Sequence, residues 1–268
     1  MMQYTLGVIG VGHMGEALLR SVIDSDCLPR NAIVAYDPVR KREQVLAMEL
    51  GILCAENNTI PGSCPRVLLA VKPQVMSKVL AEIRPVVRED ATIISIAAGI
   101  TTSYIDEQLG GKGRIVRVMP NTPMCVGAGV SAVARGPRAT PEDVHWAQRL
   151  LAAGGLAVVM DESMMDVVTG LSGTGPAYLF FLVEAMVAAA VAEGMDPDVA
   201  EMFATQTCIG AGKLLAKTKE RPSELLAAVA TPGGTTERAM NLLGESGVKE
   251  KFIEAVRAAT QRSRELGK

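Results

Sequence analysis

Two glycine-rich turns in this 268-residue sequence could bind anionic groups. The first is the G-x-G-x-x-G segment at residues 10–15, between an apolar run and an amphipathic stretch. In that context Gly10 permits a tight turn, Gly12 lets a pyrophosphate approach the backbone, and Gly15 lets a helix pack against the strand. The helix N-terminus then offers free N–H groups to phosphates. The segment favours a dinucleotide site over a glycine turn that binds nothing.

The end of the next apolar run bears on which dinucleotide would bind. Asp37 lies there, 22 residues after Gly15, where an acidic residue usually holds a ribose 2′-hydroxyl. Taken alone, Asp37 favours NAD. Arg40, Lys41 and Arg42 follow at once, and they could hold a 2′-phosphate or form a solvated helix face. The sequence therefore leaves the choice between NADP and NAD open.

Three further strand ends are expected to meet the same ligand, because the carboxyl ends of parallel strands line the crevice of such sheets. They carry the segments AVKP at residues 70–73, SIAAG at 95–99 and MPNTP at 119–123. Lys72 could contact ribose or phosphate, or be a surface lysine. Asn121 could bind the ligand or cap a turn.

The second glycine-rich turn is TPGGTT at residues 231–236, immediately before a helical pattern. Glycines ahead of a helix N-terminus form an anion cradle, and the threonines add hydroxyl donors. With one glycine pair and no neighbouring lysine, the expected guest is a carboxylate. The alternative is an ordinary threonine-capped helix after a turn.

The elements that must position these turns change in kind along the chain. Up to about residue 160, continuous Val/Ile/Leu runs alternate with amphipathic stretches, which predicts strands covered on both faces. After that point the patterns are all helical, and residues 176–193 are apolar almost all round. We expect an α/β, Rossmann-type doubly wound, mainly parallel sheet at 1–161, followed by an all-α dimerisation and substrate-binding domain at 162–268. A partner subunit would cover the apolar helix.

Composition excludes several other classes of protein. The net charge of −2 and 3% aromatic residues argue against a nucleic-acid partner. The five cysteines form no C-x-x-C pair, so neither a metal site nor a disulfide framework is expected. We see no secretory signal, and the apolar run at 177–192 is shorter than the ~20 residues that span a bilayer. The expected location is the cytoplasm, with no membrane partner.

Taken together, these motifs resemble pyrroline-5-carboxylate reductase. The carriers are the first glycine loop, AVKP, SIAAG, MPNTP, TGLSGTGPAY at 169–178 and above all TPGGTT, in the expected order over nearly the whole chain. The resemblance implies hydride transfer from NADPH or NADH to the C=N carbon of 1-pyrroline-5-carboxylate, which gives L-proline. It also implies a homodimer through intertwined helices and assembly into a decamer.

The resemblance and the motifs together assign the site. The residues expected at the cofactor are Gly10, Val11, Gly12, His13, Met14, Gly15, Asp37, Asn58, Ala70, Val71, Lys72, Pro73, Ile96, Ala97 and Ala98. Those expected at the substrate carboxylate are Thr231, Gly233, Gly234, Thr235 and Thr236, and Thr236 matches the family's threonine near the ring nitrogen. Many relatives carry a polar or basic residue where this chain has Asp37, which again leaves the cofactor preference open.

Three other readings compete with this assignment. A 3-hydroxyacid dehydrogenase has a similar two-part design but normally needs a lysine in the helical half, and Lys213 and Lys217 lie outside the G-x-x-G-x-x-x-K pattern. A nucleotide sensor would bind the cofactor without turnover. A purely structural helical dimer would not bind it at all.

Overall fold

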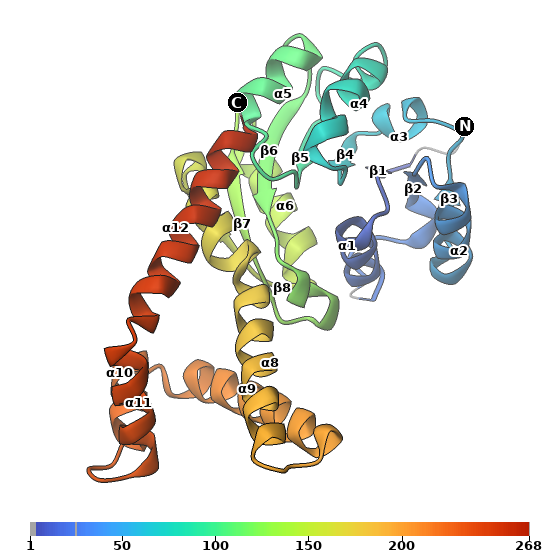
Figure 1. Cartoon of the computed structure of the whole chain (residues 1–268). Helices are drawn as coiled ribbons and strands as arrows, with labels where there is room; N and C mark the ends of the chain where they lie inside the picture. Colours follow the sequence, from blue (N-terminus) through green and yellow to red (C-terminus); the bar gives the residue numbers. More distant parts are fainter. Residues whose placement is uncertain (1–3, 25, 268) are drawn as a thin grey trace. The chain divides into compact units, whose positions relative to one another are not determined.

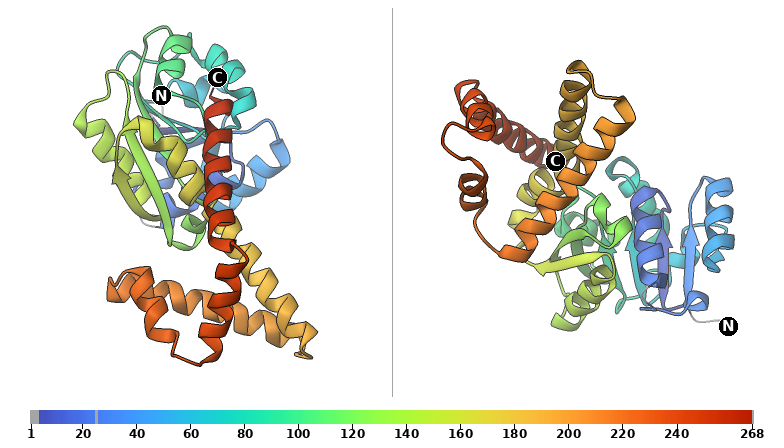
Figure 2. Two further views of the ribbon diagram at one scale, coloured as in Figure 1. Left: turned by 60° about the vertical axis from the view of Figure 1, so that its left-hand side comes forward. Right: turned by 90° about the horizontal axis from the view of Figure 1, so that it is seen from below.

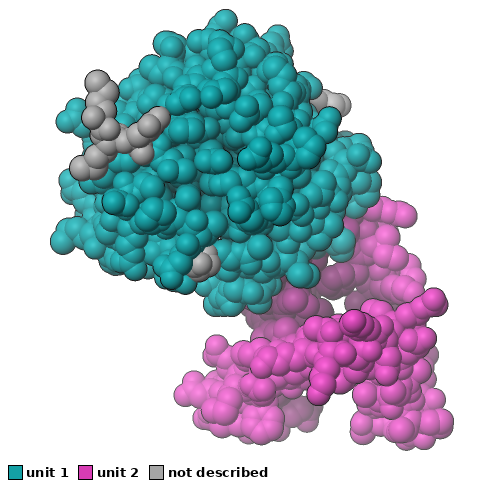
Figure 3. Space-filling view, turned by 180° about the vertical axis from the view of Figure 1, so that it is seen from behind, with its two compact units in different colours: residues 1–174, 258–268 teal, residues 175–257 magenta. Residues whose placement is uncertain are grey.

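The computed structural model describes residues 4–24 and 26–267. The chain forms two compact units, shown in different colours in Figure 3. Unit 1 comprises Met1–Thr174 and Ala258–Lys268, and unit 2 comprises Gly175–Arg257. The chain therefore changes unit at 174/175, whereas we expected a domain boundary at 161/162, and it returns to unit 1 at residue 258.

Unit 1 is built on an eight-stranded sheet in the order β3-β2-β1-β4-β5-β6-β7-β8 (Figure 1). All neighbours are parallel except the pair β6–β7. The chain runs from β1 outward through β2 and then returns to β4 on the other side of β1, which makes a topological switch point beside β1. The strands are β1 (Leu6–Ile9), β2 (Ile33–Tyr36), β3 (Leu53–Cys54), β4 (Arg66–Leu69), β5 (Thr92–Ser95), β6 (Arg114–Met119), β7 (Gly129–Arg135) and β8 (Gly155–Val159).

Helices cover both faces of this sheet (Figures 1 and 2). Alternate strand residues point to opposite faces, so that Val8 joins one apolar core and Ile9 the other. The first core includes α1 (His13–Asp24), α2 (Arg40–Leu50) and α6 (Pro141–Ala152), and the second includes α4 (Met76–Ile83) and α5 (Thr102–Leu109). The doubly wound α/β prediction is confirmed. Two short helices, α3 (Thr59–Gly62) and α7 (Met165–Val168), complete the α-helices of this unit before residue 175.

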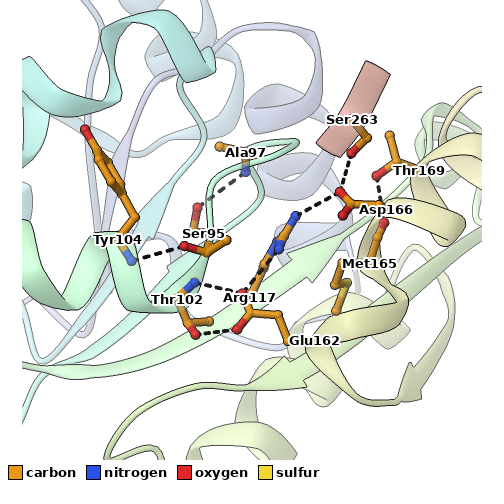
Figure 4. Close-up of polar contacts among 11 residues, drawn as sticks. Ser95, Ala97, Thr102, Tyr104, Arg117, Glu162, Met165, Asp166, Thr169 and Ser263 are labelled. Carbon is orange, nitrogen blue, oxygen red and sulfur yellow. Dashed lines mark hydrogen bonds and ion pairs between the residues drawn. The ribbon is translucent and has the colours of Figure 1, made fainter. Parts of the chain in front are cut away.

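A buried arginine fastens three distant segments of unit 1 to the sheet (Figure 4). Arg117 on β6 is 4% exposed and pairs with Glu162 at 3.2 Å and Asp166 at 3.9 Å. Glu162 also accepts hydrogen bonds from the backbone N–H and hydroxyl of Thr102, where α5 begins. Asp166 accepts one from Ser263, near the end of α12 (Val248–Leu266). The C-terminal turns of α12 are thus held within unit 1.

Unit 2 contains α8 (Gly175–Ala192), α9 (Pro197–Thr218), α10 (Pro222–Val229), α11 (Thr235–Glu245) and the first part of α12. α8 has no buried residue over its 18 positions. Phe180 and Phe181 are 68% and 65% exposed, and Phe203 on α9 is 63% exposed. These helices present far more apolar surface than a single copy of unit 2 covers.

The helical segment that runs into α8 is longer than the apolar run suggested. In the described part of the chain, one continuous stretch, Glu162–Ala192, is long and apolar enough by length and composition to cross a membrane. Its most apolar window has a mean hydropathy of 1.8 and is 6% buried. The difference arises because residues 162–173 form successive helical turns that precede α8. A helix whose apolar surface is covered by a protein partner can have the same length and composition.

Candidate functional site

The loop between β1 and α1 has room only for glycine at two positions. Gly10 adopts a φ of +95°, and a Cβ atom there would lie 2.7 Å from the carbonyl oxygen of Ala70. A Cβ on Gly15 would lie 2.3 Å from the carbonyl oxygen of Gly10. At Gly12, in contrast, a Cβ would meet nothing within 4 Å. The first and third glycines therefore serve packing, whereas the second leaves open space in front of the N-terminus of α1.

That open space is a crevice of about 520 Å³ at the carboxyl ends of the central strands. It gathers residues from five strand ends, as expected at a topological switch point. Of the residues predicted to bind the cofactor, eleven line this crevice: Gly12, His13, Met14, Asp37, Ala70, Val71, Lys72, Pro73, Ile96, Ala97 and Ala98.

A smaller pocket of about 160 Å³ shares Val71 with the crevice. It contains two more predicted cofactor residues, Gly10 and Asn58. Asn58 is 7% exposed, and its amide nitrogen donates to Glu82 at 2.5 Å. Its amide oxygen is buried without a hydrogen-bond partner in the structure. Because such an atom is costly to leave unpaired, the pocket suits a ligand that carries a hydrogen-bond donor.

Two of the predicted cofactor residues line neither pocket. Gly15 is buried against Gly10 and Ala70, as described above. Val11 is buried, and its N–H donates to the carboxylate of Asp37 at 2.8 Å. The structure therefore gives these two residues a role in shaping the loop.

Asp37 lies at the end of β2 and is 9% exposed. One carboxylate oxygen accepts from Val11 N–H, and the other accepts from Val39 N–H at 2.9 Å. These bonds fix the carboxylate between the glycine loop and the start of α2. Behind it lies Glu43, which is 2% exposed and accepts from the N–H of Asp37 at 3.3 Å.

The sequence left two roles open for Lys72 and two for Asn121, and the structure places these residues in different surroundings. Lys72 is exposed and lines the crevice directly after β4. Asn121 is 8% exposed, and its side chain links two chain segments. It donates to the carbonyl of Ser172 at 3.2 Å and accepts from the N–H of Val130 at 2.9 Å. The side chain of Asn121 therefore ties these segments together, and it makes no capping hydrogen bond to the turn that follows it.

The second glycine loop forms a tight turn in front of α11. The N–H of Gly234 donates to the carbonyl of Thr231 at 3.0 Å, with Pro232 and Gly233 between them. Gly233 has a φ of +70°, so proline and glycine occupy the positions that a type II turn prefers. Gly234 is the N-cap of α11 and has no side chain with which to cap the helix.

This arrangement leaves N–H groups for an anion. In a helix that begins at Thr235, the N–H groups of Thr235 and Thr236 have no intrahelical acceptor. The positive end of the helix dipole lies at the same place. Thr236 is half-buried, and Thr235 is exposed. Together they can bind a small carboxylate.

The carboxylate of Glu237, just after the loop, binds one of the loop's N–H groups, and the sequence pattern had not predicted this contact. Its carboxylate accepts a hydrogen bond from the N–H of Gly233 at 2.7 Å. The signal was present, because an acidic residue in the first turn of a helix commonly reaches back to free N–H groups.

Met119, Pro120 and Val39 also line the crevice in unit 1, but they were not among the residues predicted to bind the cofactor.

Two family models match different parts of the chain. Residues 162–266 match the family model "Pyrroline-5-carboxylate reductase dimerisation", and residues 5–99 match the model "NADP oxidoreductase coenzyme F420-dependent". A pyrroline-5-carboxylate reductase of Methanosarcina acetivorans is 41% identical over 264 residues, with 98% of each chain covered. One from Escherichia coli is 37% identical over 268 residues, with all of each chain covered.

Solved structures extend the same likeness. A pyrroline-5-carboxylate reductase of Coxiella burnetii superposes with a TM-score of 0.90 at 31% identity, with 99% of each chain covered. The Plasmodium falciparum pyrroline carboxylate reductase, solved with NADP bound, also has a TM-score of 0.90, at 27% identity and full coverage of both chains.

Proposed function

This chain belongs to the pyrroline-5-carboxylate reductase family, and we propose how its residues carry out that family's reaction. It is an NAD(P)-dependent oxidoreductase of proline biosynthesis. The hydride goes to the C=N carbon of 1-pyrroline-5-carboxylate, and L-proline is the product. The observation that carries the proposal is the combination of a strand-end crevice of dinucleotide type with a separate, glycine-rich carboxylate loop.

The crevice in unit 1 is our proposed cofactor site. When bound, a reduced nicotinamide cofactor supplies the hydride. Gly12 leaves its backbone accessible to the pyrophosphate, and the N-terminus of α1 faces it with free N–H groups. Ile96, Ala97 and Ala98 give one wall small, mostly apolar side chains. Asn58 can use its unpaired amide oxygen to accept a hydrogen bond from the cofactor.

The loop at 231–236 is our proposed substrate-carboxylate site. The N–H groups of Thr235 and Thr236 would bind the carboxylate, while the Thr231–Gly234 turn keeps the loop in shape. The hydroxyl of Thr236 would hydrogen-bond the ring nitrogen. A cyclic imine is electrophilic once its nitrogen is protonated, so that the protein needs to orient it and stabilise charge rather than supply a strong acid.

We assign the exposed apolar faces of unit 2 to contact with a second copy of the chain. The support is the match of residues 162–266 to a dimerisation family model and the absence of buried residues in α8. On this proposal the functional boundary is 161/162, the dimer is the minimal unit, and dimers assemble into a decamer. The same contact, rather than a membrane, would cover the apolar stretch of α8, in a protein of the cytoplasm.

The test is a spectrophotometric assay of 1-pyrroline-5-carboxylate with NADPH and NADH in parallel. We expect turnover, and we expect Thr236→Ala to lower kcat by about 10- to 100-fold while the Kd of the reduced cofactor stays near that of the wild type. Thr236→Ser keeps the hydroxyl and should recover most of the kcat. Unchanged kcat in Thr236→Ala would remove Thr236 from the mechanism, and oxidation of 3-hydroxyacids instead would favour the rival dehydrogenase.

A further inference from the structure

The end of β2 determines what the crevice can accept beside the adenosine ribose. We propose that this chain selects NADH over NADPH, with Asp37 as the residue that discriminates between them. The inference rests on the proposed function of the crevice and names its cofactor. It differs from what the Plasmodium falciparum relative shows, since that structure was solved with NADP.

The first observation concerns the charge and hydrogen bonds of the Asp37 carboxylate. Its carboxylate lines the crevice and is held by two backbone N–H groups, those of Val11 and Val39. In the described residues no cation pairs with it. Each oxygen uses one lone pair on a backbone donor and keeps another free. A ribose hydroxyl can donate to these positions, whereas a 2′-phosphate brings only acceptor oxygens and a second negative charge.

Arg40, the first arginine after Asp37 in the sequence, is already engaged. Arg40 pairs with Glu43 at 3.0 Å and donates to the carbonyl oxygens of Ala55 at 2.7 Å and Glu56 at 2.9 Å. Its guanidinium also lies over the ring of Tyr36, 5.4 Å from the ring centre. To hold a 2′-phosphate it would have to leave Glu43, whose side chain is 1% exposed, as an unpaired buried carboxylate.

A further observation concerns the lysines. Lys41 lines the surface between α1 and α2, beside Glu16 and Glu49, and is not among the crevice residues. Lys72 lines the crevice from β4, which lies on the side of β1 opposite to β2. Two strand spacings, roughly 10 Å, therefore separate the ends of β2 and β4.

Two cations remain as rivals and enter the test. Lys78 lines the smaller pocket; its side chain is 81% exposed and lies 4.0 Å from Glu82. The side chain of Arg42 lies outside what the structure describes. If either residue supplies a 2′-phosphate site, replacing it will weaken the binding of the phosphorylated cofactor alone.

The decisive measurement is calorimetric binding of 5′-AMP and 2′,5′-ADP to the full-length enzyme, because these probes differ only in the 2′-phosphate. We expect 5′-AMP to bind at least about 10-fold more tightly. The Kd values of NADH and NADPH should show the same order. Asp37→Asn removes the charge at nearly constant shape, and it should narrow the ratio of the two Kd values by about 10-fold.

These measurements distinguish a failure of this inference from a failure of the proposed function. Tighter binding of 2′,5′-ADP by the wild type overturns the inference, and loss of that preference in Arg42→Ala or Lys78→Ala would identify the cation responsible. An unchanged ratio in folded Asp37→Asn also overturns it. If Asp37→Asn fails to fold, the wild-type ratio still decides. An enzyme that reduces 1-pyrroline-5-carboxylate better with NADPH refutes this inference alone, whereas no turnover with either cofactor refutes the proposed function.

Discussion

The two glycine loops of this chain are shaped by different forces. In the loop at 10–15, a Cβ on Gly10 would collide with the carbonyl oxygen of Ala70 at the end of β4, and one on Gly15 with that of Gly10. In the loop at 231–236, a Cβ on Gly233 would meet nothing within 4 Å, and one on Gly234 would lie 2.7 Å from the hydroxyl of Thr231 in the same turn. Tertiary packing fixes the first loop, whereas a local turn conformation fixes the second.

The units that carry the loops differ in the same way. The central strands of unit 1 are buried on both faces, and a buried ion-pair cluster around Arg117 fastens its outer segments. In unit 2, α8 has no buried residue and large apolar side chains lie exposed. This contrast supports our proposal that a single chain provides the cofactor site by itself, while the helical half depends on a second copy.

The largest expected effect comes from crowding the packed loop. Gly15→Ala places a Cβ against the carbonyl oxygen of Gly10, so that we expect the Kd of the reduced cofactor to rise by at least about 100-fold. Fluorescence titration with NADH measures it, and circular dichroism reports the fold. Gly244→Ala in α11 is the matched control, because its Cβ would meet nothing within 4 Å and it should bind NADH normally.

Gly12→Ala separates packing from ligand contact within the same loop. Its Cβ has free space, so that the protein should unfold at the wild-type temperature yet bind NADH poorly. Wild-type binding by Gly15→Ala would contradict the contrast between the loops, and wild-type binding by Gly12→Ala would move the pyrophosphate away from this residue.

A second, smaller effect tests whether a second copy covers unit 2. Phe180→Asp puts a carboxylate on the exposed face of α8. We expect the dissociation constant of the dimer to rise about 30-fold, because a buried unpaired charge is costly. Size-exclusion chromatography with light scattering over a dilution series measures this. Met48→Asp on α2 of unit 1, where the methionine is 86% exposed, is the control and should leave the oligomer intact.

The smallest expected effect concerns the open loop. Glu237 places a carboxylate where the substrate carboxylate is proposed to bind, so that Glu237→Gln should lower the KM for 1-pyrroline-5-carboxylate about threefold. Steady-state kinetics at saturating cofactor measures the change. Glu245→Gln makes the same charge change at the other end of α11 and should leave KM unaltered. A KM that rises in Glu237→Gln would mean that Glu237 assists binding.

The prediction from sequence was most successful where local rules dominate. The apolar periodicity predicts a strand at 114–119 and helices at 40–50 and 248–266, and β6, α2 and α12 have these bounds. Short β3 and the antiparallel pairing of β7 with β6 were not foreseen, since two residues carry no periodicity and strand direction depends on the path of the chain. The crevice was foreseen because parallel strands bring their carboxyl ends to one edge.

By itself, the sequence determined the fold class, the two glycine loops and most of the residues that line the crevice, because spacing and periodicity encode these features locally. Only the tertiary structure decided that Arg40 reaches the carbonyl oxygens of Ala55 and Glu56, that Asn121 links two segments, and that Val11 N–H donates to the carboxylate of Asp37. These are questions of which side chain finds which partner. Their answers depend on distances between segments that the order of residues along the chain does not specify.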